Sequence, residues 1–402
     1  MALLILTLSI QINVVKLTDD INLIKLTNDS VSYYPQWVSD TEFLYIRIEG
    51  WRYRTDYSDY RSNPWKPLSN LYIKNINTGI AKRVTNFANC EIKEFKISPN
   101  KRWCAILLAD MGDTLVPDVF GEIINKRLYI LELGSNRLKL LKEGNISSIQ
   151  WITNSTIVGC IKNSRIFKLN ISNGTYKEKQ ICHVSKYKNF NIDEICQHNR
   201  GILPIQVYQE SLYYECPDGT KNFLPLEYSL AVIDTALENF QYVHKGAPDL
   251  GPYFLGWFGE KKIGYIPWDI YYEEKDPADT LVPIYIKDLS SGKIIKKFFP
   301  LAHTGYRIVW LKEYDKALIQ RVNVWDVASL FVWDICKDRV IPCIKAINTI
   351  RNFDVLKVSN GYKVLFNIRD CKYNYDYIYE RFNVNLILNV YLIEIIDTKV
   401  NE

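Results

Sequence analysis

The stretch that decides the fold runs from Leu26 to Ser39 and reads LTNDSVSYYPQWVS. Its tryptophan, Trp37, lies in a short apolar segment, and segments of the same kind surround Trp151, Trp257 and Trp310. The intervals between these tryptophans are 114, 106 and 53 residues, or two, two and one periods of a unit of roughly 55 residues. The positions that this count skips are occupied by Phe95, Ile202–Tyr208 and Phe353–Val358.

A second marker follows each of these segments. It is a run of alternating apolar and polar residues, the pattern of a half-buried strand, and several copies end in a glycine turn of the kind that closes a hairpin. The seven copies are LYIKNINTG from Leu71, RLYILELGSN from Arg127, RIFKLNISNG from Arg165, SLAVIDT from Ser229, IYIKDLSSG from Ile284, LFVWDICKD from Leu330 and VYLIEIID from Val390.

Two alternating markers at an even spacing are typical of four-stranded sheets repeated radially. We therefore predict an all-β fold, a single β-propeller domain over residues 1–402 with seven blades of four antiparallel strands. The blades are expected to start near residues 33, 91, 147, 200, 252, 304 and 350. A β-sandwich or a β-solenoid is the alternative, but a sandwich does not normally carry a four-strand period and a solenoid has a shorter one.

The N-terminal 30 residues allow two interpretations. Ile21–Thr27 is similar to the outer strand of the next unit, so we expect it to complete the last blade and close the ring, which protects exposed edges. Ala2–Ile10 also has the composition of the apolar region of a secretory signal, although no basic residue precedes it. The strict alternation over Leu6–Val14 favours a strand, and the compartment stays open. No segment has the roughly 18–20 apolar residues that a membrane span needs.

The repeat resembles that of TolB-type propellers. The resemblance rests on LTN, six residues later PQWVS, then FLYI, LYIKNINTG and RVTN, and on the turn from Ser98 to Lys101, which is similar to S-P-D-G-K. It implies a fold similar to the propeller domains of dipeptidyl peptidase IV and prolyl oligopeptidase relatives. No G-x-S-x-G sequence occurs, so we expect the propeller without the hydrolase domain and no serine peptidase activity.

Four long segments follow the second strands of their blades, and we predict them to be loops: Glu49–Asn70, Ala109–Lys126, Pro267–Val282 and Arg369–Leu388. Loops of this length are often functional, and tyrosine and tryptophan bury large areas at low entropic cost. We predict a non-catalytic binding or scaffold propeller that recognises a protein or peptide on this face. The candidate binding residues are Trp51, Tyr53, Tyr57, Tyr60, Trp65, Trp268, Tyr271, Tyr272, Tyr373, Tyr375 and Tyr377.

Two other interpretations of these segments stay open. In the first, their aromatic residues pack each loop onto its own blade. A carbohydrate-binding or carbohydrate-active propeller, lyase-like or glycosidase-like, would use acidic side chains of the central channel. The sequence offers several carboxylates and singles out no pair: Asp56, Asp59, Asp113, Asp118, Asp269 and Glu273.

Charge, metal-ligand residues and cysteines mainly exclude functions. A net charge of +5 without any lysine or arginine run gives nucleic-acid binding no support. Cys182, His183, Cys196 and His198 are zinc-ligand types, but their spacing matches no standard finger, so we expect no metal and no cofactor. The nine cysteines are expected to be small buried residues, and Cys336 and Cys343 are close enough to pair in an oxidising compartment. We expect a monomer with a protein or peptide partner and no membrane span.

Overall fold

A computed structural model describes a large part of the chain. The described residues are 14–16, 21–53, 65–110, 126–144, 146–161, 165–180, 190–195, 199, 201–215, 221–246, 251–267, 283–298, 306–310, 316–322, 327–334, 339–347, 349–359, 361–376 and 381–396.

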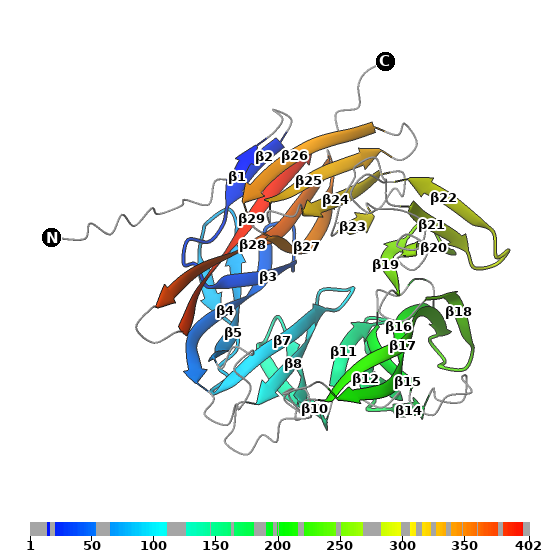
Figure 1. Ribbon diagram of the computed structural model, residues 1–402. Coiled ribbons are helices and arrows are strands. Elements are labelled where there is room, and N and C mark those ends of the chain that lie inside the picture. Colours follow the sequence, from blue (N-terminus) through cyan, green and yellow to red (C-terminus); the bar gives the residue numbers. More distant parts are fainter. Residues whose placement is uncertain are drawn as a thin grey trace. The chain divides into compact units, whose positions relative to one another are not determined.

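All regular elements of the described residues are strands, and they form seven antiparallel sheets that follow one another along the chain (Figure 1). Six sheets have four strands, and the seventh has four strands and an added fifth. The predicted fold class is confirmed: the protein is an all-β, seven-bladed propeller. No helix long and apolar enough to cross a bilayer occurs in the described ranges.

The first three blades each consist of four strands that are consecutive in the chain. Blade one consists of β3 (Ser32–Trp37), β4 (Glu42–Tyr53), β5 (Trp65–Asn75) and β6 (Ala81–Arg83). Blade two consists of β7 (Cys90–Ile97), β8 (Trp103–Asp110), β9 (Lys126–Glu132) and β10 (Arg137–Gly144). Blade three consists of β11 (Ile146–Trp151), β12 (Thr156–Ile161), β13 (Arg165–Asn170) and β14 (Tyr176–Gln180).

Blades four and five follow in the same order. Blade four consists of β15 (Phe190–Ile195), β16 (Ile202–Glu215), β17 (Lys221–Asp234) and β18 (Phe240–Lys245). Blade five consists of β19 (Pro252–Trp257), β20 (Lys262–Pro267), β21 (Pro283–Asp288) and β22 (Ile294–Phe298).

The last two blades take strands from both ends of the chain. Blade six consists of β23 (Tyr306–Trp310), β24 (Lys316–Val322), β25 (Val327–Asp334) and β26 (Arg339–Ile347), with β1 (Val14–Lys16) as its fifth strand. Blade seven consists of β27 (Thr349–Val358), β28 (Gly361–Asp376), β29 (Arg381–Ile396) and β2 (Ile21–Lys25).

The chain divides into two compact units, Gln36–His303 and Met1–Pro35 with Thr304–Glu402. In the first unit the middle strands are buried and the outer strands are exposed. Thus β12, TIVGCI, is buried along its whole length, whereas β14, YKEKQ, is almost entirely exposed. A strand covered on both faces has a continuous apolar sequence, and an edge strand carries charges. Buried clusters join blade two to three, three to four and four to five.

The tryptophan marker has a structural reason in this unit. The indole Nε1 of Trp151 donates a hydrogen bond to the carbonyl of Lys96 in the preceding blade at 2.7 Å. Gln36, just before Trp37, donates to the carbonyl of Phe95 at 2.8 Å and accepts from the amide of Ile97 at 3.1 Å. The repeated segment therefore connects neighbouring blades through hydrogen bonds between its side chains and their backbones.

The predicted glycine turns are confirmed at three hairpins. Gly79, Gly174 and Gly292 have positive φ angles of 71°, 73° and 72°, a conformation that glycine adopts without a steric penalty. Four residues before the glycine of the Asn-Thr-Gly turn, Asn75 accepts hydrogen bonds on its Oδ1 from the amides of Asn77 and Thr78. Asn170 and Asp288 do the same in the other two turns.

One predicted strand position is wrong. Ile202–Tyr208 was expected to be the first strand of blade four, near residue 200, but it belongs to β16, the second strand. The first strand is β15, whose sequence FNIDEI has no tryptophan to mark it.

In the second unit the N-terminal segment completes blade seven, as predicted. β2 pairs with β29 from Ile21 opposite Ile395 to Lys25 opposite Tyr391. Beyond the ladder, the amide of Leu26 donates to the carbonyl of Val390 at 2.8 Å, and the amide of Val390 donates to Thr27 Oγ1 at 2.9 Å. The pairing of β1 with β26 was not predicted, and residues 1–13 lie outside the described part of the chain.

Candidate binding surface

Two of the four predicted loops begin and end as strands. In blade one, β4 and β5 stay paired as far as Tyr53 and Trp65, so the described ends of Glu49–Asn70, residues 49–53 and 65–70, are strands. In blade seven, β28 and β29 stay paired as far as Asp376 and Arg381, so the described parts of Arg369–Leu388, residues 369–376 and 381–388, are strands as well. The loop predictions are wrong at these residues because the polar and aromatic alternation of each segment continues the ladder of its blade. The other two segments, 111–125 and 268–282, lie outside the described residues.

A third long hairpin was missed. β16 and β17 stay paired as far as Glu215 and Lys221. The signal for it was in the sequence: an alternating segment leads into Pro217-Asp218-Gly219, and Asp-Gly favours a hairpin turn.

Near the far end of each of the three ladders, one aromatic residue lies opposite another. These pairs are Tyr53 with Trp65, Tyr213 with Phe223, and Tyr375 with Phe382.

The predicted site residues fall into two groups. Trp51 and Tyr53 lie on β4, Trp65 begins β5, and Tyr373 and Tyr375 lie on β28. The others lie outside the described residues: Tyr57, Tyr60, Trp268, Tyr271, Tyr272 and Tyr377. All six candidate carboxylates and the Cys182, His183, Cys196 and His198 group also lie outside.

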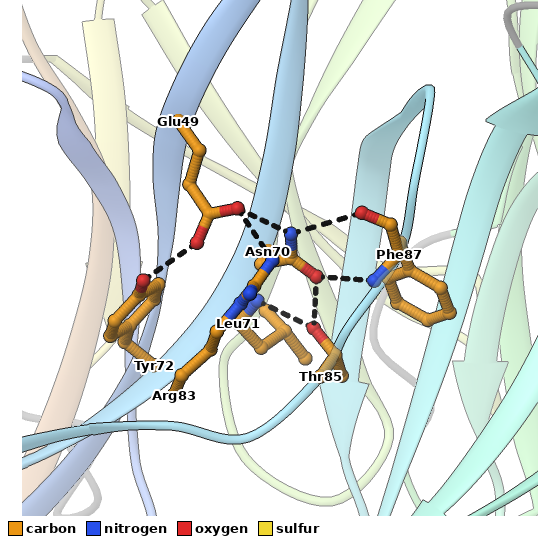
Figure 2. A network of polar contacts seen from close by, with 7 residues as sticks. All are labelled: Glu49, Asn70, Leu71, Tyr72, Arg83, Thr85 and Phe87. Carbon is orange, nitrogen blue, oxygen red and sulfur yellow. Dashed lines mark hydrogen bonds and ion pairs between the residues drawn. The ribbon is translucent and has the colours of Figure 1, made fainter.

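A polar network holds the base of the blade-one hairpin (Figure 2). The ladder register shifts between Ile48 and Gly50, so Glu49 is the extra residue of a β-bulge. Its carboxylate accepts hydrogen bonds from Asn70 Nδ2 at 2.8 Å, from Tyr72 Oη at 2.6 Å and from Arg83 Nη2 at 2.6 Å. This cluster cannot be predicted from the sequence, because the alternation of a strand gives no sign of a bulge at Glu49.

Asn70 is the buried centre of the network. It is only 1% exposed, and its Nδ2 also donates to the carbonyl of Phe87 at 3.2 Å. Its Oδ1 accepts from Thr85 Oγ1 at 2.9 Å and from the amide of Phe87 at 2.7 Å. The amide therefore satisfies both donors and its acceptor, and it joins β4, β5 and the segment that leads to blade two.

The network also shapes the local electrostatics. Partial burial and the hydrogen bond to Glu49 raise the pKa of Tyr72 above its ordinary value of 10.0. The guanidinium of Arg47 lies 5.2 Å from the centre of the Tyr72 ring. The phenol therefore stays protonated and remains a donor to the carboxylate throughout the neutral range.

Metal-ligand and thiol chemistry is sparse in the described part of the chain. No group of three or more histidine, cysteine, aspartate or glutamate side chains comes together there in a metal-binding arrangement. Cys90, Cys104, Cys160 and Cys343 are buried thiols, as expected of small core residues. The sequence allowed a disulfide between Cys336 and Cys343; Cys343 is a free thiol, and Cys336 lies outside the described residues.

Comparisons with known proteins place the chain among β-propellers. No family model and no curated protein matches the sequence. Among solved structures, oligogalacturonate lyase from Vibrio parahaemolyticus is similar with a TM-score of 0.55 at 10% identity, over 96% of this chain and 97% of the lyase. A prolyl endopeptidase is similar with a TM-score of 0.53 at 8% identity, over 89% of this chain and 46% of the peptidase. U3-55K is similar with a TM-score of 0.50 at 8% identity, over 92% of this chain and 98% of U3-55K. At these identities the likeness is one of fold.

Proposed function

We propose that this propeller is a non-catalytic binding or scaffold module that recognises a protein or peptide through the segments that follow the second strands of its blades. The observation that carries the proposal is the blade-one hairpin, a ladder that ends in the opposite pair Tyr53 and Trp65 and is held at its base by the Glu49 and Asn70 network. The TolB-type character of the repeat is part of the same proposal.

Anchoring supports a binding role because it lowers the entropic cost of association. A free two-stranded hairpin is marginally stable in water, whereas this one is joined to the buried amide of Asn70. A surface held in place before binding loses less conformational entropy when a partner arrives. Tyrosine and tryptophan are also the residues that most often dominate the binding energy of protein interfaces.

The experiment that tests the proposal is affinity capture with the purified protein from an extract of its own organism. One variant replaces Tyr57, Trp65, Trp268 and Tyr375 by alanine, and a matched control replaces Tyr176, an exposed aromatic residue on β14. We expect one stoichiometric partner with the wild type and with Tyr176→Ala, and its loss with the fourfold variant. A partner that the fourfold variant still captures at wild-type yield contradicts the proposal.

The carbohydrate-binding or carbohydrate-active alternative uses the same aromatic positions beside Asp269 and Glu273. Its test is a panel of oligosaccharides, uronate-containing ones included, with and without a divalent cation. A thermal shift or turnover with any member supports this alternative, and neither with all of them removes it.

A further inference from the structure

The outer strand of blade five has one open edge. β22 is the last strand of the sheet order β19-β20-β21-β22, and its ladder partner is β21. Within the described ranges no other strand pairs with it. An open edge presents a row of backbone donors and acceptors that another strand can use.

The register identifies which backbone groups face outward. The amide of Asp288 donates to the carbonyl of Lys293 at 2.9 Å, so these two residues form a hydrogen-bonded pair. The ladder then continues without a bulge to Pro283 opposite Phe298. Because hydrogen-bonded and non-hydrogen-bonded pairs alternate in an antiparallel ladder, Ile295 and Lys297 bond to β21. The amides and carbonyls of Ile294, Lys296 and Phe298 therefore point away from the sheet.

The β22 edge carries exposed apolar side chains, as does β10, where Leu138 and Leu140 are each 41% exposed. Ile294 is 45% exposed, Ile295 is 39% exposed and Phe298 is 52% exposed. Successive side chains of a strand point to opposite faces, so Ile294 and Phe298 lie on one face of the edge and Ile295 lies on the other. Both faces therefore carry an exposed apolar residue. By comparison, β6 has only three residues, AKR, and β14 has one exposed aromatic residue among charged ones.

The charged residues of the β22 edge are all positive. Residues 293–298 contain Lys293, Lys296 and Lys297 and no carboxylate. Lys296 lies over the rings of Tyr285 and Phe298, at 5.9 Å and 5.1 Å from their centres. No aspartate or glutamate of the described residues lies within ion-pair distance of these three lysines, whereas on β14 the carboxylate of Glu178 pairs with Arg165 at 2.9 Å.

We propose that the β22 edge binds an extended acidic peptide segment as a fifth strand of blade five. The outward amides and carbonyls of Ile294, Lys296 and Phe298 supply the ladder, as in other cases of strand addition. The exposed isoleucines and phenylalanine accept apolar residues of the segment, and the lysines select glutamate or aspartate at the alternate positions. The same lysines oppose pairing with a second copy of this edge, because like charges would lie close together. This surface is separate from the aromatic hairpins.

The probe is a fluorescein-labelled peptide of eight residues that alternates valine and glutamate, followed by fluorescence anisotropy on the full-length protein. A peptide that alternates valine and lysine is the control. We expect the acidic peptide to bind at least about tenfold more tightly than the basic one, since strand addition is the same for both and the charge differs. Equal affinity for the two peptides, or no binding of the acidic one, overturns the proposal.

Two variants separate strand addition from simple charge attraction. Lys296→Pro removes an outward amide that makes no bond to β21, and proline is tolerated at such edge positions. Lys296→Gln removes only the charge. We expect Lys296→Pro to bind the acidic peptide about tenfold more weakly than Lys296→Gln, with both variants unfolding at the same temperature.

A charge reversal gives a second readout should Lys296→Pro unfold. Lys296→Glu combined with Lys297→Glu keeps every backbone group and is expected to prefer the basic peptide over the acidic one. Acidic-peptide binding that neither the proline variant nor the charge reversal changes overturns the proposal.

Discussion

The Nδ2 atom of Asn70 donates a hydrogen bond of 2.8 Å to the carboxylate of Glu49, which joins the bulged residue of β4 to the neighbouring strand β5. Glu49 marks the point where the blade-one ladder continues toward Tyr53 and Trp65. Because bulges re-aim side chains and bend the strand, this contact sets the direction of the hairpin. The proposed binding role of this hairpin therefore depends on the stability of its base.

Replacing Asn70 by alanine tests how much the base depends on this amide. The variant removes four hydrogen bonds and leaves the carbonyl and amide of Phe87 without the side chain that they contact. An unsatisfied buried group costs roughly 1–3 kcal/mol, so we expect a loss of about 2 kcal/mol in the free energy of unfolding. Urea titration followed by tryptophan fluorescence measures it. The control Asn77→Ala, at an exposed turn position, is expected to change stability by less than about 0.5 kcal/mol.

Gly159 on β12 tests the packing of blade three. A Cβ atom at this position would lie 2.3 Å from the ring of Phe167 and 3.1 Å from the carbonyl of Ser148. Phe167 is fully buried, so its ring cannot move away easily, and we expect Gly159→Ala to cost about 1–3 kcal/mol. Gly134→Ala is the matched control because nothing lies within 4 Å of its Cβ. Equal melting temperatures for the two variants would contradict the described packing.

Glu178 gives a pH-dependent prediction. Its hydrogen bond from Tyr176, together with the nearby Arg165 and Lys142, lowers its pKa below the ordinary 4.5. The ionised carboxylate therefore stabilises the folded state above pH 4.5, and this contribution is lost as the pH falls below 4.5 through the folded-state pKa. We expect Glu178→Gln to melt at a lower temperature than the wild type at pH 7. The difference should shrink as the pH falls, and a constant difference down to pH 3 would argue against the assignment.

The buried thiols give a chemical prediction. Burial raises the pKa of Cys104 well above its usual range and raises that of Cys343 to about 12. Since the thiolate is the reactive form, both should resist iodoacetamide at pH 8 in the folded protein and react after urea is added. Peptide mass spectrometry locates the label. Rapid native labelling of either residue would show that the core of its blade is open.

The architecture could be predicted from the sequence because the blades repeat the same pattern of strands and turns. The tryptophan segment, the alternating strand and the glycine turn each have a local cause, and the contacts of Trp151, Gln36 and Gly79 show those causes. The closing strand β2 was readable for the same reason, since it has the pattern of an outer strand.

The bulge, the added strand and the long hairpins could not be predicted in the same way. The bulge at Glu49 and the pairing of β1 with β26 depend on contacts between segments far apart in the chain. The hairpin segments of blades one and seven predict loops, because their tyrosines, arginines and aspartates fit a loop as well as an exposed ladder. The first strand of blade four has no aromatic marker, so its position could not be located by the repeat.

The most direct test of the binding role is site-specific photocrosslinking from the aromatic hairpin of blade one. Benzoylphenylalanine is placed at Trp65 in one protein and at Tyr176 in another, and each is irradiated in an extract of the source organism. The proposed binding role predicts one crosslinked protein partner from position 65, and none from position 176. No partner from position 65, or the same partners at equal yield from both positions, would contradict it.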